Sequence, residues 1–450
     1  MKWPKYVLVA IAVPVALAAA LPLFISLDDY RPRIEEEASA RLKQPVTIKS
    51  IKFAVLPLPH VTVSGIAAGK AGDITVGSVT LTPELFSLLQ TTRIIKTVEI
   101  DSLVLTQKGL DAILALAGAA AAQSSPTPAV RVSNIRLENV VARLDKTDFG
   151  PFDARVKLDS TGKPEDASIT TRDGKLKALI KPDQANYLID VNARAWVLPA
   201  GPPLLFDELN IKGVATADDV RLDEIKARLY GGTVAGKMRL NWKKGLRIDG
   251  NLAIDEVELQ QLAPLLSPGT RVSGKLSAGP VFSAAADAAD QVANALRLET
   301  GFKVRNGVLH GVDIQQAATL LIKQGTAGGE TRFEHLSGHL QVAQGSHHFT
   351  QLRIASGALS AEGRVSVTPK KALSGRILAQ VKAVGTSAAV PLNVGGTVGA
   401  PLLYPTGGTM AGAALGTVIL GPGFGTSVGA KAGGWAGGLF EANPQQTPKR

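Results

Sequence analysis

Apolar and polar residues alternate along most of this 450-residue chain, in short runs separated by turns of Gly, Asn, Asp and Pro. Alternation with a period of two is typical of strands that bury one face and expose the other. Strand patterns outnumber helical ones, and many are joined by tight turns, which favours an extended antiparallel sheet over alternating βαβ units. The clearest strands are expected at 60–64, 98–105, 131–137, 187–196, 226–230, 233–242, 246–254, 339–342, 351–354 and 364–367.

Helical patterns interrupt the strands at only a few places. An amphipathic, acidic helix is expected at 29–43, directly before Gln44-Pro45. The longest of the others, at 108–122, is apolar and runs into a linker-like stretch. The remaining candidates lie at 83–90, 258–266, 286–296 and 313–323. The chain is therefore expected to be mainly β with a few helices.

So many half-apolar strands on one sheet would create a very large apolar face. This face either packs against a second layer or stays concave and holds apolar ligands, and periodicity does not choose between the two. With only 5% aromatic residues and 46 glycines, the chain suits a thin, turn-rich β structure better than a thick core. If the face is a groove, its candidate lining residues are Ile48, Val61, Val63, Leu340, Val342, Leu352 and Ile354.

One long apolar segment stands apart from this pattern, at the N-terminus. Residues 6–27 carry no charge, and at about 1.5 Å per residue a helix of this length spans a hydrocarbon core of about 30 Å. A cleaved signal peptide is the alternative, and either reading places the bulk of the chain outside the cytoplasm. The membrane-anchor candidates are Tyr6, Leu8, Ile11, Leu17, Leu21, Phe24 and Leu27.

The C-terminal region is also apolar, but it is dominated by glycine. Between Lys382 and Glu441 the only charged residue is Lys431, and many glycines recur at intervals of four. Such spacing forms a smooth stripe on a helix and permits close helix packing in lipid, which predicts a helical tail that inserts into or lies on a membrane. The alternative is a flexible low-complexity tail, because so much glycine disfavours helix. The candidate packing residues are Gly408, Gly412, Gly416, Gly425, Gly429, Gly433 and Gly437.

Composition excludes several function classes. The chain has no cysteine, so disulfides, thiolate catalysis and thiolate metal sites are impossible. Its net charge of +11 fits a surface that meets anionic lipid headgroups. Nucleic acid is not expected as a partner, because the basic residues are scattered and form no stripe interleaved with aromatics.

No sequence motif meets the requirements of a catalytic or cofactor-binding site. Two Gly-x4-Gly-Lys sequences, beginning at Gly231 and Gly269, lack the following Ser or Thr of a phosphate-binding loop. His335 and His339 are four residues apart, but their surroundings predict a strand, where that spacing corresponds to about 13 Å. The acidic pair at 218–219 reads as a turn. We therefore expect no enzyme, no metal and no cofactor.

Several segments together resemble the AsmA family. The start of the exported part, Asp28 to Ile51 (DDYRPRIEEEASARLKQPVTIKSI), is similar to that family's acidic helix and first strand, and a Leu-Pro segment at 56–59 and a strand at 60–66 follow. The C-terminal half carries the stronger match, while residues 126–250 match only in strand character. The C-terminal segments are FKVRNGVLHGVDI at 302–314, FEHLSG at 333–338, LRIASG at 352–357, Glu362-Gly363, and PLNVGGT at 391–397 with Pro401.

The resemblance implies a fold and a function. AsmA-like proteins are anchored in the inner membrane of Gram-negative bacteria, with a periplasmic, elongated and curled β-sheet that forms an apolar groove. It implies phospholipid as the bound partner and support of outer-membrane assembly as the role. The rival hypothesis is a scaffold or assembly factor that binds another envelope protein and moves no lipid. The chain is short for the family, which leaves room for a partner protein or a shuttle-like role.

The same considerations predict five regions along the chain. Residues 1–27 form the cytoplasmic end and the anchor, and 28–125 form an N-terminal AsmA-like module. Residues 126–300 are a β-rich middle, 301–405 are the C-terminal AsmA-like module, and 406–450 are the glycine-rich tail. The expected location is the bacterial inner membrane, with one span and the bulk in the periplasm.

Overall fold

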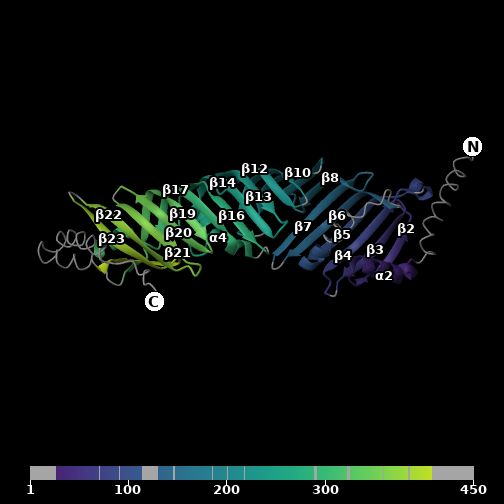
Figure 1. The fold of residues 1–450 in the computed structure, drawn as a ribbon, viewed down its shortest axis with the longest axis horizontal. Coiled ribbons are helices and arrows are strands. Elements are labelled where there is room, and N and C mark those ends of the chain that lie inside the picture. The colour runs from purple at the N-terminus through teal and green to yellow at the C-terminus, as the bar shows by residue number, and fades with distance from the viewer. Residues whose placement is uncertain are drawn as a thin grey trace, which may run out of the picture. The chain divides into compact units, whose positions relative to one another are not determined.

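The computed structural model describes residues 27–407, apart from gaps at 70, 91, 114–129, 145–146, 185, 200, 217, 288–290, 322–324, 358 and 384–385. The chain divides into two compact units, one up to Gly201 and one from Pro202. Both are built mainly of strands (Figure 1), which confirms the expected mainly β fold. The five-part division made from the sequence stays a prediction.

The first unit is a sheet of ten strands. β1 and β2 both pair with β3, and from β3 onward each strand pairs with the next one in the chain, up to β10. The strands are β1 (Val46–Thr47), β2 (Ser50–Ala54), β3 (His60–Ala68), β4 (Ile74–Pro83), β5 (Arg93–Thr106), β6 (Val130–Leu144), β7 (Thr147–Leu158), β8 (Pro164–Thr171), β9 (Leu176–Asp183) and β10 (Asn186–Val197).

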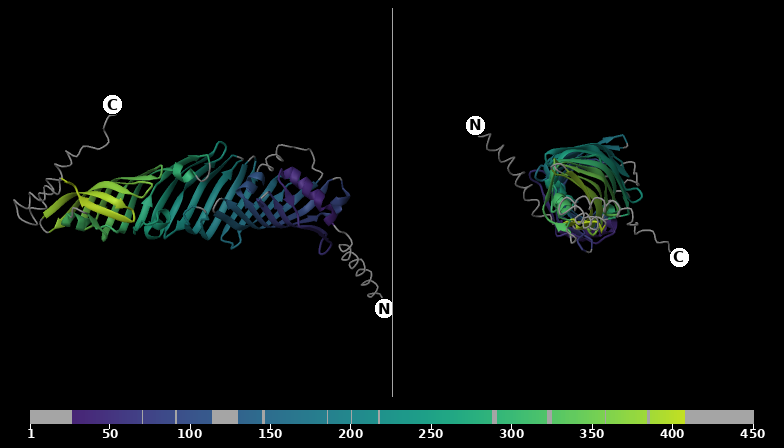
Figure 2. Two further views of the ribbon diagram at one scale, coloured as in Figure 1. Left: turned by 90° about the horizontal axis from the view of Figure 1, so that it is seen from below. Right: turned by 90° about the vertical axis from the view of Figure 1, so that its left-hand side faces the viewer.

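The second unit continues the same pattern of consecutive pairing with two exceptions. β15 and β16 share the space between β14 and β17, and β18 pairs with the last strand, β24. Seen end-on, its C-terminal strands curve round and do not lie flat (Figure 2, right). The strands are β11 (Leu205–Ala215), β12 (Asp219–Leu229), β13 (Gly232–Asn241), β14 (Leu246–Glu258), β15 (Lys275–Ala278), β16 (Val281–Ala286), β17 (Arg297–His310), β18 (Thr326–Ala327), β19 (Glu330–Ala343), β20 (Ser346–Ala355), β21 (Leu359–Val367), β22 (Leu373–Ala383), β23 (Thr386–Thr397) and β24 (Ala400–Pro405).

The expectation of a purely antiparallel sheet is wrong at one pair of strands. β5 and β6 run parallel, with Arg93 opposite Val130 and Thr106 opposite Arg143. Two parallel strands cannot be joined by a tight hairpin and need a crossover connection. The long apolar segment expected to be helical at 108–122 belongs to this crossover, and its described part is helical over 107–113.

A line of backbone irregularities crosses the middle of β3 to β6. Gly65, Ser102 and Asn139 have φ values of 66°, 56° and 56°, and Gly77 of β4 lies between the first two. We call these four residues the kink line. At each, two apolar residues of the strand are three positions apart instead of two, in the sequences VSGI, VGSV, IDSL and LENV. A residue with positive φ re-phases a strand as a β-bulge does, so the apolar side chains on both sides of the line reach the same face.

The helices occur close to their expected positions, with two differences. η2 and α2 correspond to the helix expected at 29–43, and α4 and α6 lie within 258–266 and 313–323. The segment 83–90 forms a 3-10 helix, η3, instead of an α-helix. Within 286–296, Ala286 still belongs to a strand, residues 288–290 lie outside the described part, and Val292–Ala295 form an α-helix, α5. The bounds are η2 (Asp28–Tyr30), α2 (Arg31–Leu42), η3 (Leu85–Leu89), α4 (Leu259–Leu266), α5 (Val292–Ala295) and α6 (Ile314–Leu320).

Both predicted membrane-seeking ends lie almost wholly outside the described residues. The anchor occupies residues 6–27, of which only Leu27 is described, and all seven glycines of the tail fall after residue 407. Within the described part of the chain, no helix is both long and apolar enough to cross a membrane.

Candidate functional site

Two unbroken rows of apolar side chains cross the first unit from β3 to β10. Strand register places the residues of each row directly opposite one another, on one face of the sheet. The first row is Val61, Leu81, Val98, Ile135, Val156, Ala167, Ile180 and Ile189. The second row is Val63, Val79, Ile100, Leu137, Ala154, Ile169, Ala178 and Val191.

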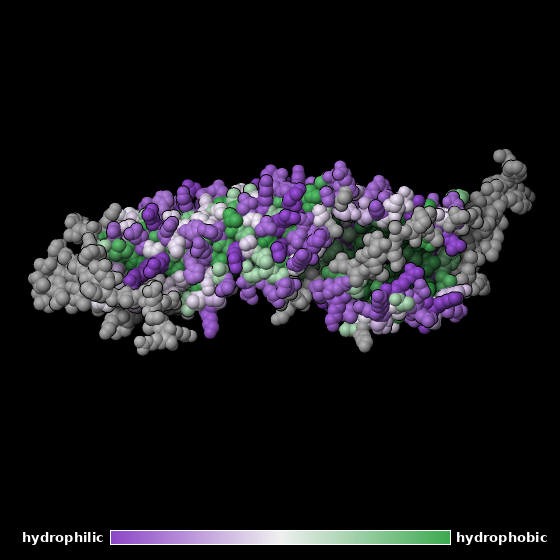
Figure 3. Space-filling view, in the orientation of Figure 1, coloured by the Kyte–Doolittle hydropathy of each residue, from purple (hydrophilic) through white to green (hydrophobic). Residues whose placement is uncertain are grey.

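The large side chains of these rows are not fully buried. Only the two small residues Ala154 and Ala178 are buried, and every Val, Ile and Leu of both rows is half-buried. Figure 3 shows this part of the molecule hollowed, with hydrophobic residues inside and hydrophilic residues along its rim. Because these apolar side chains stay incompletely buried along eight strands, this face is the candidate binding surface of the first unit.

The same face is covered on the other side of the kink line. Val46, Ala68, Ile74, Leu103, Leu105 and Val140 are buried there in one cluster. Ala38 and Leu42 of α2, and Leu110 and Ile113 of the crossover helix, pack against it. The kink line therefore lies between a packed strip and an open strip of one apolar face, and Ile100 and Leu137 of the second row also pack against the buried cluster.

In the second unit, β11 to β14 carry an apolar row that is only partly open. The row runs through Leu209, Ala227, Val234 and Ile254, each opposite its neighbour. Leu209 and Ala227 are buried, while Val234 and Ile254 are half-buried. Along β13 from 233 to 240, the even positions are half-buried and the odd positions are exposed.

The C-terminal end of the second unit is filled instead. Helix α6 packs its buried Ile314, Ala317 and Ala318 against β21 to β24, where Ala379 and Leu392 are fully buried. Thr331 of β19 fixes the start of the helix, because its hydroxyl accepts from the Ile314 backbone N–H (3.0 Å) and donates to the Val312 carbonyl (2.8 Å). The Asp313 side chain caps the helix by accepting from the Gln316 N–H at 2.8 Å. Here the apolar face is a core.

The seven groove candidates from the sequence fall into three groups. Val61 and Val63 lie in the two rows of half-buried apolar residues. Leu340, Val342 and Leu352 are half-buried, while Ile354 packs against the filled C-terminal cluster. Ile48 is buried, and its backbone N–H donates to the Glu35 carboxylate of α2 at 2.6 Å.

Sequence reasoning missed most of the lining. Leu81, Ile135, Val156 and Ile180 were not singled out, because their membership of a row depends on strand register and not on local alternation. One local signal in the sequence could have helped. At the kink line, successive apolar residues are three positions apart instead of two, which indicates a strand that bulges and then continues with its apolar side chains on the same face.

The opposite face carries the charges in the form of exposed ion pairs. A hollow of about 670 Å³ is lined mainly by polar residues of β5 to β9, together with Ile135 and Val156 of the first apolar row. Two of its bases are paired: Arg136 with Glu99 at 2.6 Å and Lys157 with Glu165 at 2.8 Å. The hydrogen bond and the charge of Glu165 raise the pKa of Lys157. Exposed pairs of this kind contribute little stability, but they keep this face in water.

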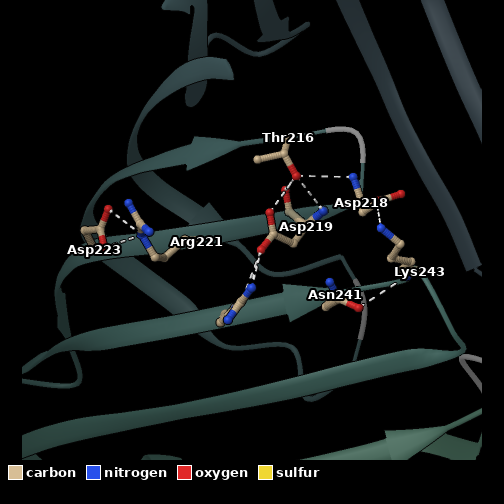
Figure 4. A network of polar contacts seen from close by, with 8 residues as sticks. Thr216, Asp218, Asp219, Arg221, Asp223, Asn241 and Lys243 are labelled. Carbon is tan, nitrogen blue, oxygen red and sulfur yellow. Dashed lines mark hydrogen bonds and ion pairs between the residues drawn. The ribbon is translucent and has the colours of Figure 1, made fainter. Parts of the chain in front are cut away.

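A compact polar network fixes the turn between β11 and β12 (Figure 4). The Thr216 hydroxyl donates to Asp219 Oδ1 at 2.6 Å and accepts the backbone N–H groups of Asp218 and Asp219. The Arg239 guanidinium donates to Asp219 Oδ2 at 2.7 Å. The Thr216 hydrogen bond, followed by the one from Arg239, lowers the pKa of the Asp219 carboxyl. The acidic pair is therefore a turn, as its sequence predicted.

The histidines take ordinary strand positions. His335 and His339 both lie in β19, and the His339 Nε2 is 2.9 Å from Glu299 Oε1. His347 lies on the apolar face opposite Val342 and Val367, and burial lowers its pKa. Among the described residues, no group of three or more His, Asp or Glu side chains is arranged to hold a metal ion.

Comparison with known protein families gives one result. Residues 133–352 match the model of the AsmA family. This part of the chain is AsmA-like, and the resemblance inferred from the sequence is confirmed. Comparisons with curated proteins and with solved structures found no match.

The AsmA match covers β6 to most of β20 and so spans the end of the first unit and much of the second. It includes the motifs at 302–314 and 333–338. It also includes the middle region, where the sequence had suggested only strand character. The N-terminal motif at 28–66 and the motifs after residue 352 lie outside the matched range.

Proposed function

We propose that the protein binds phospholipid acyl chains on the open strip of its apolar face and moves them along it, in the periplasm and anchored to the inner membrane, in support of outer-membrane assembly. The observation that carries this proposal is the pair of half-buried apolar rows that cross eight strands of the first unit. The AsmA match supports the same class of function.

Physical chemistry explains why acyl chains fit this surface. Each methylene that leaves water contributes about 0.8 kcal/mol, so even partial burial of two chains yields a large favourable term. The rows consist of aliphatic side chains, whose contacts are not directional. An acyl chain can therefore move along them without breaking a hydrogen bond. The polar headgroup would remain at the hydrophilic rim, in contact with water.

Photo-crosslinking in the full-length chain tests the proposal. A benzoylphenylalanine placed at Ile180 on the open row should capture phospholipid, detected by mass spectrometry of the purified adduct. Leu179 is the matched control, because it is its neighbour in β9, is also half-buried and lies on the opposite face. Absence of a lipid adduct at 180, or equal yields at 179 and 180, would contradict the proposal and favour the rival role of a scaffold that moves no lipid.

A further inference from the structure

Three connections meet at one rim of the first unit. The β2–β3 turn lies at this rim, because Ala54 pairs with His60. The β4–β5 connection lies there too, because Val61 pairs with Leu81 near the end of β4, and Pro83 pairs with Ile95. The start of β6 joins them, since β5 and β6 are parallel and both begin at this rim.

This rim exposes large apolar side chains from all three connections. Leu56 and Leu58 of the first turn are 51% and 52% exposed, and Leu85 and Phe86 of η3 are 48% and 81% exposed. Val130 at the start of β6 is 49% exposed. We call these five residues the lip. Single exposed hydrophobic residues need no explanation, but five gathered on one rim form a patch of the kind that meets a partner or a membrane.

The two exposed residues of η3 are held in place by a buried serine between them and the sheet. Ser87 is 2% exposed, and its hydroxyl donates to the Glu84 carbonyl at 2.7 Å and accepts the Ile94 N–H at 2.8 Å. A flexible turn could fold Leu85 and Phe86 back onto the sheet. This pinned turn keeps them directed outward instead, at the cost of their exposure to water.

The position of the lip points to a lipid bilayer as its partner. Asp28, directly after the uncharged segment 6–27, accepts the Ile51 backbone N–H at 3.0 Å and so fixes the chain's entry point to β2. Leu56 lies five residues further along, at most roughly 17 Å away at about 3.3 Å per residue. Exposed basic residues Lys52, Arg93 and Lys96 flank the lip, with Glu84 as an acidic neighbour. Apolar side chains with a basic surround fit an anionic bilayer surface.

We infer that the lip inserts into the bilayer that holds the N-terminal segment, and that it is where lipid enters the open strip. Insertion of the lip stands by itself, whereas the entry of lipid at the lip rests on the proposed function. The first open row ends at the lip, because Val61 directly follows the β2–β3 turn and Leu81 lies two residues before the end of β4. An acyl chain that leaves the bilayer at the lip therefore meets the apolar row without crossing a polar strip.

Depth-dependent quenching in the full-length protein tests insertion. The chain has no cysteine, so single Cys variants at Leu58 and Phe86 can each carry one environment-sensitive fluorophore. In vesicles of phosphatidylethanolamine and phosphatidylglycerol, brominated acyl chains should quench both labels and shift their emission to the blue. Leu188 on β10 is the control matched to Leu58, because the two are 46% and 52% exposed, but Leu188 lies six strands from β4. Equal quenching at 58, 86 and 188, or none at 58 and 86, would overturn the inference.

A second measurement tests entry and separates the inference from the proposed function. The double variant Leu58→Asp with Phe86→Asp should reduce the lipid adduct at position 180, while Leu188→Asp should leave it unchanged. Quenching at the lip with no adduct at 180 in the otherwise unchanged chain would refute lipid carriage and leave insertion standing. An adduct at 180 that the double variant does not reduce would refute entry at the lip and leave carriage standing.

Discussion

The open strip of the first unit and the filled end of the second start from the same strand pattern and reach opposite outcomes. On β4 to β7 the apolar positions of the two open rows are mostly Val, Ile and Leu, and these large side chains remain half-buried. On β21 and β22, Ala361 and Ala379 lie opposite each other, and beside them Gly363 lies opposite Ile377. Small residues leave room for Ala317 and Ala318 of α6 to approach the sheet closely. Small residues thus permit the close approach of α6, but α2 also packs over the larger residues Ile74, Leu103 and Val140, so residue size alone does not decide whether a helix covers the face.

The largest effect expected from this difference is on stability. Leu392→Ala removes a fully buried side chain in the filled end and should lower the free energy of unfolding by about 3 kcal/mol, since the site cannot refill with water or ligand. Leu81→Ala, in the open row, should cost about 1 kcal/mol because that side chain is already half-exposed. Urea denaturation of the two variants measures both. Equal losses would mean that the open strip is packed as tightly as the filled end.

Enlarging a side chain should also affect the two regions differently. Ala317→Leu overfills the contact between α6 and the sheet and should cost about 1–3 kcal/mol. Ala167→Leu places the same extra atoms in the hollow of the open row, where the change in stability should stay within about 0.5 kcal/mol. Its effect should appear in function, as a weaker lipid adduct at position 180. A large loss of stability from Ala167→Leu would contradict the picture of open space above that row.

A smaller effect on stability is expected from a substitution at the kink line. Gly65 has φ of 66°, and a Cβ there would lie 2.7 Å from the Lys49 Cβ, so Gly65→Ala should cost more than the roughly 1 kcal/mol typical of positive φ alone. Gly162→Ala is the matched control, with φ of 84° and no atom within 4 Å. Thermal unfolding should show the difference as a lower Tm for the first variant. A difference of zero would mean that the β3 kink can relax freely.

The smallest expected effect is a pH dependence at His347. Burial, followed by the neighbouring His348, lowers its pKa below the ordinary histidine value of 6.5. The unfolded chain then binds the proton more readily than the folded one, so stability falls as the pH drops from 6.5 through the folded pKa. His347→Phe should flatten the change in urea midpoint across that range. An unchanged slope would place the pH dependence in other groups.

Local pattern was sufficient for the strands and helices but not for the choice between groove and core. The alternation along β13 and the helix at 313–323 could be predicted because each depends on neighbouring residues. The filling of the C-terminal end depends on α6 meeting β22 to β24 and on Thr326 pairing with Leu403, contacts between residues far apart in sequence. The parallel β5–β6 pair escaped prediction for the same reason. The lip escaped because its residues come from three separate connections.

The kink line is also held by hydrogen bonds on the polar side of the sheet. On the outer side of the line, the Ser102 hydroxyl donates to Asp101, Asn139 Nδ2 donates to the Ser102 hydroxyl, and the Asn139 N–H donates to Asp153 at 2.9 Å. These bonds join β5, β6 and β7 from the water-facing side. The bends at the kink line are thus held from the side opposite to the apolar rows. Under the proposed function, the strip would keep its frame while lipid is loaded and released.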